Sequence, residues 1–209
     1  MKQDKDTHFV ITISRQLGSG GAYIGQQLAK KLNIFYADRE IIRKAARQLS
    51  VLVKELESRD EKILSFWESF LQFSTFVQDL YIPPEKMIPT DHELFETESK
   101  IIKHIAKERS AVVIGRCGFH LLRDYPNHVS IFLHGDTAFR NERIRKLYNL
   151  SEEDAGKMIA QSDKERAFYC KTFTGREWAD ARNYDISIDT GKIDVDKTVE
   201  LILKYLKLF

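Results

Sequence analysis

Apolar runs alternate along the chain with amphipathic stretches, and each pattern predicts a different element. Five short apolar segments are typical of strands buried in a parallel sheet. Between them, apolar residues recur every three or four positions, as in helices with one buried face. The predicted strands lie at residues 9–13, 33–37, 111–114, 128–133 and 185–189. The predicted helices lie at about residues 24–32, 39–48, 89–106, 137–147, 151–169 and 195–206.

The alternation of strands and helices predicts an α/β protein with a parallel sheet and right-handed crossovers. At 209 residues, the chain is expected to form a single domain with room for a sizeable insertion. Residues 51–82 also have a helical pattern, and aromatic residues are concentrated at residues 64–82. This aromatic-rich stretch is expected to be a buried helix face rather than an aromatic ligand site. Its outer side fits a homodimer surface as readily as a pocket wall.

The first predicted strand runs into a glycine-rich turn and then into a helix. Gly18, Gly20 and Gly21 would let the backbone approach an oxyanion, and the helix N-terminus would present free N–H groups to it. The usual phosphate-binding loop, G-x-x-x-x-G-K-[S/T], has a lysine and a hydroxyl where this chain has Gly21 and Ala22. Taken alone, the turn fits a phosphate-binding loop and an ordinary tight connection about equally well.

Arginines follow three of the predicted strands, at Arg15, Arg39 and Arg116. Because ligands bind at the carboxyl ends of the strands in such sheets, we expect these guanidinium groups to surround one site. Guanidinium groups clamp phosphates with paired hydrogen bonds and neutralise their charge. Each arginine alone fits a surface ion pair better, and only their shared position at strand ends favours a phosphate site.

A second group of basic side chains lies at residues 140–171, within two of the predicted helices. Its periodicity fits a solvated helix face with ion pairs three or four residues apart. The functional alternative is a lid that brings cations over bound phosphates and excludes water when it closes. The group contains Arg140, Arg143, Arg145, Lys157, Lys164, Arg166 and Lys171.

Composition narrows the classes of function. The net charge of +2 gives no electrostatic case for nucleic acid or an anionic membrane as a partner. The sequence has neither an apolar run long enough to span a bilayer nor a signal-peptide pattern, so a cytoplasmic location is expected. Cys117 and Cys170 lie far apart, and neither a disulfide nor a cysteine-based zinc site is expected. His92 and His104 are not spaced as metal ligands, and no protein-bound metal is expected.

Five motifs, in order along nearly the whole chain, resemble the cytidylate-kinase-like branch of the P-loop nucleoside monophosphate kinases. They lie at residues 13–21, 36–42, 113–117, 163–169 and 183–190. The resemblance implies a three-layer P-loop fold with a five-stranded parallel sheet. It places a helical acceptor-binding insertion at about residues 39–107 and a lid at about residues 148–176. It also implies that the γ-phosphoryl group of ATP is transferred to CMP or dCMP, with Mg²⁺ as the second cofactor.

The resemblance also assigns roles to individual residues. Those that would face the acceptor nucleotide are Asp38, Arg39 and Arg116. Those that would hold ATP are Ser14, Gly18, Ser19, Gly20 and Gly21, with either serine able to supply a hydroxyl. The cations that would act in catalysis are Arg15, Arg143, Lys164 and Arg166. Within this set, Arg15 is a candidate replacement for the missing loop lysine.

Two departures from the wider family pattern keep alternatives open. The glycine-for-lysine change is shared by this branch, so it does not indicate decay. Cys117, however, stands where cytidylate kinases proper have an aspartate that reads the cytosine edge and the sugar. The leading hypothesis is a kinase, favoured by the arginines. The alternatives are a nucleotide-binding regulatory module with little or no turnover, favoured by the missing lysine and hydroxyl, and a kinase for a non-nucleotide acceptor, suggested by the aromatic-rich residues 64–82.

Overall fold

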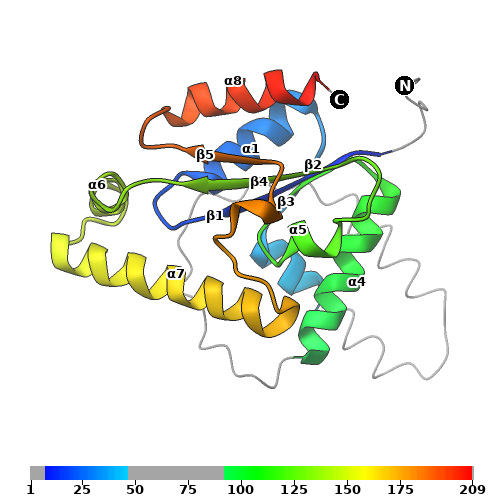
Figure 1. Cartoon of the computed structure of the whole chain (residues 1–209), viewed down its shortest axis with the longest axis horizontal. Helices are drawn as coiled ribbons and strands as arrows, with labels where there is room; N and C mark the ends of the chain where they lie inside the picture. The colour runs from blue at the N-terminus through cyan, green and yellow to red at the C-terminus, as the bar shows by residue number, and fades with distance from the viewer. Residues whose placement is uncertain (1–7, 47–91, 209) are drawn as a thin grey trace.

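A single parallel sheet of five strands forms the centre of the protein (Figure 1). The computed structural model describes residues 8–46 and 92–208. The strand order in the sheet is β2-β3-β1-β4-β5, and every neighbouring pair is parallel. The strands are β1 (Val10–Arg15), β2 (Phe35–Ala37), β3 (Ala111–Ile114), β4 (His128–His134) and β5 (Ile186–Asp189). The expected five-stranded α/β fold is therefore confirmed.

Helices cover both faces of the sheet and make three layers, as Figure 1 shows. On one face lie α1 (Gly21–Leu32) and α8 (Val195–Leu206), and on the other lie α4 (His92–Glu108) and the short α5 (Gly118–Leu121). Two further helices, α6 (Thr137–Tyr148) and α7 (Glu152–Thr174), connect β4 to β5. The strands are apolar throughout because successive side chains point to opposite faces and both faces are buried.

Successive side chains of β1 pack into two different hydrophobic clusters, one on each face of the sheet. Ile11 and Ile13 belong to the cluster beneath α1 and α8. Val10 belongs to the cluster beneath α4, and all three side chains are fully buried. Between them, the buried Thr12 bonds to Nε2 of His128 on β4 at 2.7 Å. The central strand is thus fixed on both faces, which holds its carboxyl end in a defined position.

Helix caps follow the polar residues that precede each helix. Ser151 Oγ accepts the N–H of Asp154 at 3.1 Å, and the carboxylate of Asp136 accepts the N–H of Phe139 at 2.7 Å. Asp136 and Ser151 are therefore the N-caps of α6 and α7. Helix α7 continues beyond its predicted end at residue 169 and stops before Gly175, which has a left-handed φ of 68°.

Two short elements were not expected from the sequence, and parts of the expected structure lie outside the described residues. Helix α5 and a 3₁₀ turn at Ala181–Asn183 were not anticipated, because elements this short have no periodic pattern. Of the helix expected at residues 39–48, residues 39–46 are described and helical. The aromatic-rich residues 64–82, with their suggested dimer surface or pocket wall, lie outside the described residues, as does most of the expected insertion.

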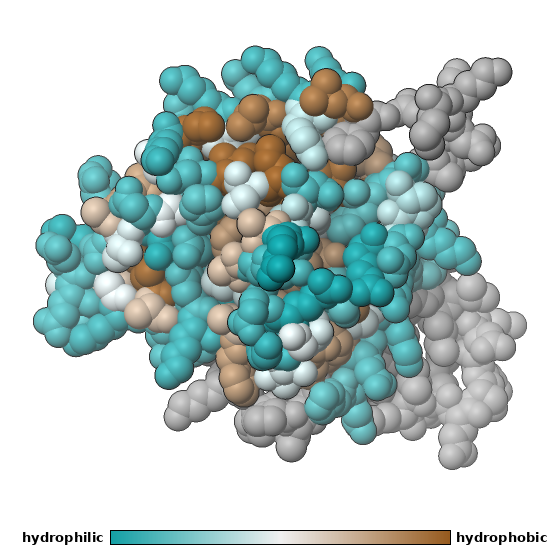
Figure 2. Space-filling model, viewed as in Figure 1, coloured by the Kyte–Doolittle hydropathy of each residue, from teal (hydrophilic) through white to brown (hydrophobic). Residues whose placement is uncertain are grey.

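The surface is mostly polar on the face that Figure 2 shows, and hydrophobic residues there gather mainly over α8. Among the described residues, Leu201 on α8 and Leu208 just after it are exposed. None of the described helices combines the length and the apolar character that crossing a membrane requires.

Candidate active site

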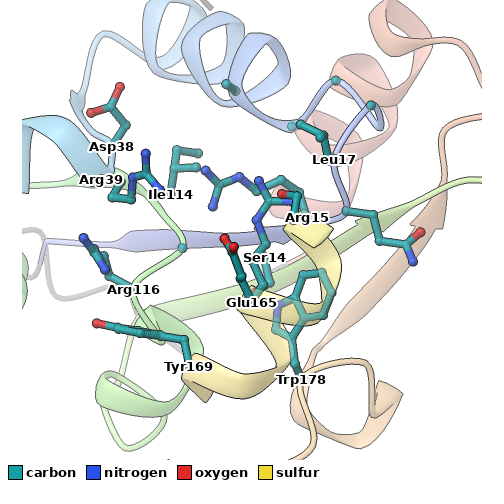
Figure 3. A pocket seen from close by; sticks show the side chains of 18 of the residues that line it. Ser14, Arg15, Leu17, Asp38, Arg39, Ile114, Arg116, Glu165, Tyr169 and Trp178 are labelled. Carbon is teal, nitrogen blue, oxygen red and sulfur yellow. The ribbon is translucent and has the colours of Figure 1, made fainter. Parts of the chain in front are cut away.

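A cavity opens at the carboxyl ends of β1, β2 and β3, where ligands bind in open parallel sheets. Its walls come from the loops after these strands and from α6 and α7. Its volume of about 200 Å³ is several times the roughly 30 Å³ that one water takes up in the liquid. Figure 3 shows Asp38, Arg39 and Arg116 toward one end, and Ser14, Arg15 and Leu17 toward the other.

The glycine-rich turn forms the second of these ends and leads directly into α1. Gly18 and Gly20 have φ angles of 87° and 77°, in the left-handed region that favours glycine. Gly20 is the N-cap of α1 and offers no capping side chain, so the first N–H groups of the helix are left for another acceptor. With the helix dipole behind them, these N–H groups suit an anion.

Two arginines lie against this turn. If Gly20 carried a Cβ, that atom would lie 3.4 Å from Nη2 of Arg143 on α6. A Cβ on Gly21 would lie only 2.7 Å from Cβ and 2.6 Å from Cγ of Arg15. The side chain of Arg15 continues toward Gly115, where an added Cβ would collide with its Nη1. The guanidinium of Arg143 therefore lies beside the turn, whereas that of Arg15 lies beside Gly115 after β3, and both arginines line the cavity.

A largely buried ion pair between α6 and α7 also holds the turn in place. Nη1 of Arg140 on α6 lies 2.6 Å from Oδ2 of Asp163 on α7. Oδ1 of Asp163 accepts the N–H of Leu17 at 3.1 Å, and Arg140 donates to the carbonyl of Leu17 at 3.2 Å. Helices α6 and α7 thus fix the turn at one residue, by contacts across more than a hundred positions of sequence.

The opposite end of the cavity carries Asp38 and Arg39. Asp38 accepts the N–H of Ile41 at 3.0 Å and so caps the helix that begins at residue 39. Burial, and then the nearby positive charge of Arg116, lower the pKa of Arg39. Two guanidinium groups held close together in this way favour an anion between them.

Arg116 is held by a carboxylate that the sequence analysis did not identify. Its Nη2 lies 3.1 Å from Oε1 of Glu98 on α4, and both side chains are buried. The hydroxyl of Tyr169 on α7 donates to Oε2 of Glu98 at 3.2 Å, and Arg116 lies over the Tyr169 ring. An acidic residue on the buried stripe of α4, three positions before Ile101, is the sequence signal that would have found Glu98.

The two cysteines meet on one wall of the cavity, although the sequence separates them by more than fifty residues. The two thiols belong to one buried cluster, and the interaction with Cys170, together with burial, raises the pKa of Cys117. The same interaction lowers the pKa of Cys170. Both thiols are free, as the sequence led us to expect. Cys117 therefore presents a small buried thiol, not a carboxylate, to the cavity.

Ten of the twelve site residues expected from the sequence line the cavity. They are Ser14, Arg15, Gly18, Gly20, Gly21, Asp38, Arg39, Arg116, Arg143 and Arg166. The hydroxyl of Ser19 is turned inward instead, where it donates to the carbonyl of Gln16 at 2.8 Å. Lys164 is exposed and does not line the cavity. The face of α7 that does so carries residues 162, 165, 166, 169 and 170, at the spacing of one helical stripe.

Within the described residues, five arginines and three carboxylates line the cavity, so its charge favours an anion. The third carboxylate, Glu165 on α7, was not anticipated. Its Oε1 accepts a hydrogen bond from Gln161 at 2.6 Å, whereas Oε2 is buried and has no hydrogen-bond partner in the described structure. Figure 3 shows Glu165 between the two ends of the cavity. A carboxylate oxygen in that position can bind a cation or a ligand hydroxyl.

Known proteins resemble this chain in sequence and in fold. The cytidylate kinase of Saccharolobus islandicus (strain Y.G.57.14 / Yellowstone #1) is 27% identical over 203 residues, which cover 95% of this chain and 91% of the relative. An uncharacterized protein from Eubacterium ventriosum superposes with a TM-score of 0.72 at 26% identity, covering 96% of this chain and 99% of the other. A shikimate kinase from Bacteroides thetaiotaomicron shares the fold, with a TM-score of 0.53 at 14% identity, covering 95% and 98%. The family model for cytidylate kinase-like proteins matches residues 10–192, and the chain belongs to that family.

Proposed function

We propose that the protein is a nucleoside monophosphate kinase that transfers the γ-phosphoryl group of ATP to CMP or dCMP. The observation that carries this proposal is the cavity itself, in which a glycine-rich helix N-terminus and five arginines face one space. Phosphoryl transfer depends on positioning and on neutralising charge, and needs little other chemistry from the protein. Membership of a kinase family and the relative named cytidylate kinase give independent support.

ATP is assigned to the end of the cavity formed by the glycine-rich turn. The backbone N–H groups from Gly18 to Gly21 would surround its β- and γ-phosphates, beside the buried Ser14. Arg15, Arg143 and Arg166 would supply positive charge around the transferring group. Ser19 contributes by holding the shape of the turn, since its hydroxyl is bonded within it. Lys164 takes no part in this arrangement, because it is exposed on another face of α7.

The acceptor is assigned to the other end, where Arg39 and Arg116 would bind its phosphate. Asp38 lies beside them, with its carboxylate partly committed to capping the following helix. A monophosphate held there would face the γ-phosphate of ATP across the cavity. Cys117 offers no carboxylate to a cytosine or a ribose, so discrimination among bases rests on other contacts.

Mg²⁺ accompanies ATP in phosphoryl transfer, where it screens the phosphate charge and orients the oxygens. Glu165 fits such an ion, because its buried Oε2 lacks a hydrogen-bond partner in the described structure. The loop hydroxyl that usually binds the metal is replaced by Ala22. We therefore assign Glu165 as the protein's contact to Mg²⁺, directly or through water, with phosphate oxygens and water as the other ligands.

The proposal is tested with Mg·ATP, the full chain and a panel of acceptors, by measuring ADP release. The panel contains CMP, dCMP, AMP, GMP and UMP, together with shikimate and gluconate, the acceptors named for kinases of the same fold. ADP release that requires CMP or dCMP supports the proposal. ADP release only with a non-nucleotide acceptor would replace it with a different kinase activity. Binding of ATP without turnover on any acceptor would favour a regulatory module.

A further inference from the structure

The charge that a phosphate-binding loop normally carries on its lysine is found elsewhere in this chain. When the motif G-x-x-x-x-G-K-[S/T] is aligned on Gly20, its first glycine falls at position 15 and its lysine at position 21. This chain has arginine at 15 and glycine at 21. Compared with the motif, the glycine and the basic residue have exchanged positions, so the loop still carries one cation.

The geometry explains why the two changes belong together. The stem of Arg15 fills the space that a side chain at position 21 would enter, because a Cβ there would lie 2.6 Å from Cγ of Arg15. Carbon atoms in contact stay about 3.5–4.0 Å apart, so a lysine at 21 and this conformation of Arg15 exclude each other. The far end of Arg15 passes Gly115 just as closely. Gly21 thus leaves open the space that the stem of Arg15 fills, and the guanidinium lies against Gly115.

We propose that Arg15 is the phosphate-contacting cation of this loop and that Gly21 is required because Arg15 occupies the lysine's place. The inference rests on the proposed binding of ATP to the glycine-rich turn. Arg15 enters from the end of β1, which is held by β3 and β4 on either side. Its guanidinium is planar and can bind two phosphate oxygens at once, whereas a lysine acts as a single point charge. Charge neutralisation in this kinase therefore comes from the end of β1 and not from the first turn of α1.

The reciprocal exchange is the direct test. Binding of Mg·ATP to the full-length protein is measured by calorimetry for the wild type, Arg15→Ala, Gly21→Lys and the double variant Arg15→Gly/Gly21→Lys. Lys30→Ala, at an exposed position near the end of α1, is the control for a lost positive charge. Melting temperatures without ligand show which variants are folded.

We expect Arg15→Ala to bind ATP about ten- to a hundredfold more weakly, since charge-assisted hydrogen bonds are lost. Gly21→Lys alone should melt at a lower temperature and bind weakly because its side chain collides with Arg15. The double variant should recover affinity to within about tenfold of the wild type, as one loop cation is restored. If this variant fails to fold, Arg15→Lys provides the second test, and it should bind ATP more tightly than Arg15→Ala.

Three results would overturn the inference. The first is an Arg15→Ala variant that binds ATP as tightly as Lys30→Ala. The second is a folded double variant that binds no more tightly than Arg15→Ala, and the third is an Arg15→Lys variant no better than Arg15→Ala. Failure of the wild type to bind ATP would instead contradict the proposed function itself, so the two failures are distinguishable.

Discussion

Arg116 and Glu98 form a buried ion pair, with Nη2 and Oε1 3.1 Å apart, between the end of β3 and the middle of α4. Both side chains are more than nine-tenths buried, so each charge depends on the other for compensation. Because Arg116 lines the cavity, the pair also links the packing of α4 to the position of a guanidinium proposed to bind the acceptor.

Replacing Glu98 with glutamine is expected to destabilise the fold by about 3 kcal/mol, because the charge of Arg116 stays buried without its partner. Urea unfolding measures the change. The double variant Glu98→Gln/Arg116→Met should recover part of the loss, since it removes both charges. The control is Asp124→Asn, which breaks an exposed pair with Arg123 and should cost less than about 1 kcal/mol. An equal, small loss for Glu98→Gln and Asp124→Asn would show that the buried pair matters no more for stability than the exposed one.

His128 makes the stability depend on pH. Burial is the main cause that lowers its pKa to about 4 from an ordinary 6.5. The unfolded chain therefore takes up a proton near pH 6.5 that the folded protein resists until about pH 4. The stability that comes from keeping His128 neutral is therefore fully present above pH 6.5 and is lost as the pH falls toward 4.

The free energy of unfolding is expected to drop by about 2 kcal/mol between pH 7 and pH 5 through this group. His128→Gln removes the titration and should flatten that part of the pH dependence, whereas His92→Gln, at an exposed position, should leave it unchanged. Urea unfolding of the three proteins at several pH values provides the measurement. A His128→Gln variant with the same pH dependence as the wild type would rule this mechanism out.

Two glycines should respond to alanine in opposite directions. At Gly18, φ is 87° and a Cβ would lie 2.9 Å from the carbonyl oxygen of Arg140, so Gly18→Ala should cost about 2–4 kcal/mol. At Gly156, within α7, the nearest atom would be 3.4 Å away, and Gly156→Ala should stabilise by up to about 1 kcal/mol. Thermal melting distinguishes them. A Gly18→Ala protein as stable as the wild type would show that the turn does not require this conformation.

Asp163 is expected to set the position of the glycine-rich turn that is proposed to bind ATP. In Asp163→Asn, one of the two acceptors for Leu17 and Arg140 becomes a donor, so one hydrogen bond is lost. We expect roughly tenfold weaker binding of Mg·ATP, measured by calorimetry. Glu153→Gln, which removes an exposed ion pair with Lys157 on the same helix, is the control and should bind ATP normally. Unchanged ATP affinity in Asp163→Asn would mean that the contacts of Asp163 with Leu17 and Arg140 serve stability alone.

The sequence predicted those features that depend on neighbouring residues. All five strands were anticipated, because short apolar runs between polar ends require no knowledge of the partners. The caps at Ser151 and Asp38 are local in the same way, because each side chain accepts the N–H of the residue three positions later. The expectation that Arg15, Arg39 and Arg116 would share one site followed from the rule that strand ends meet at one edge of a sheet.

What the sequence did not predict depends on contacts between distant elements. Glu98 meets Arg116 and Tyr169 only because α4 and α7 pack beside the end of β3. Lys164 was assigned to the site through the family resemblance, but its side chain falls outside the stripe of α7 that lines the cavity. The collision between Arg15 and a side chain at position 21 could not be predicted, because it depends on the direction of the Arg15 side chain, which no local pattern specifies.

Transfer of a phosphoryl group from ATP to a pyrimidine monophosphate is the activity proposed for this cavity. It can be followed by ³¹P NMR of the full-length protein with Mg·ATP and CMP, which distinguishes each phosphate of the substrates and products. We expect ADP and CDP to appear in equal amounts as ATP and CMP are consumed, with the same result for dCMP and dCDP. ATP that stays intact, or ADP that forms with inorganic phosphate and without CDP, would contradict the claim.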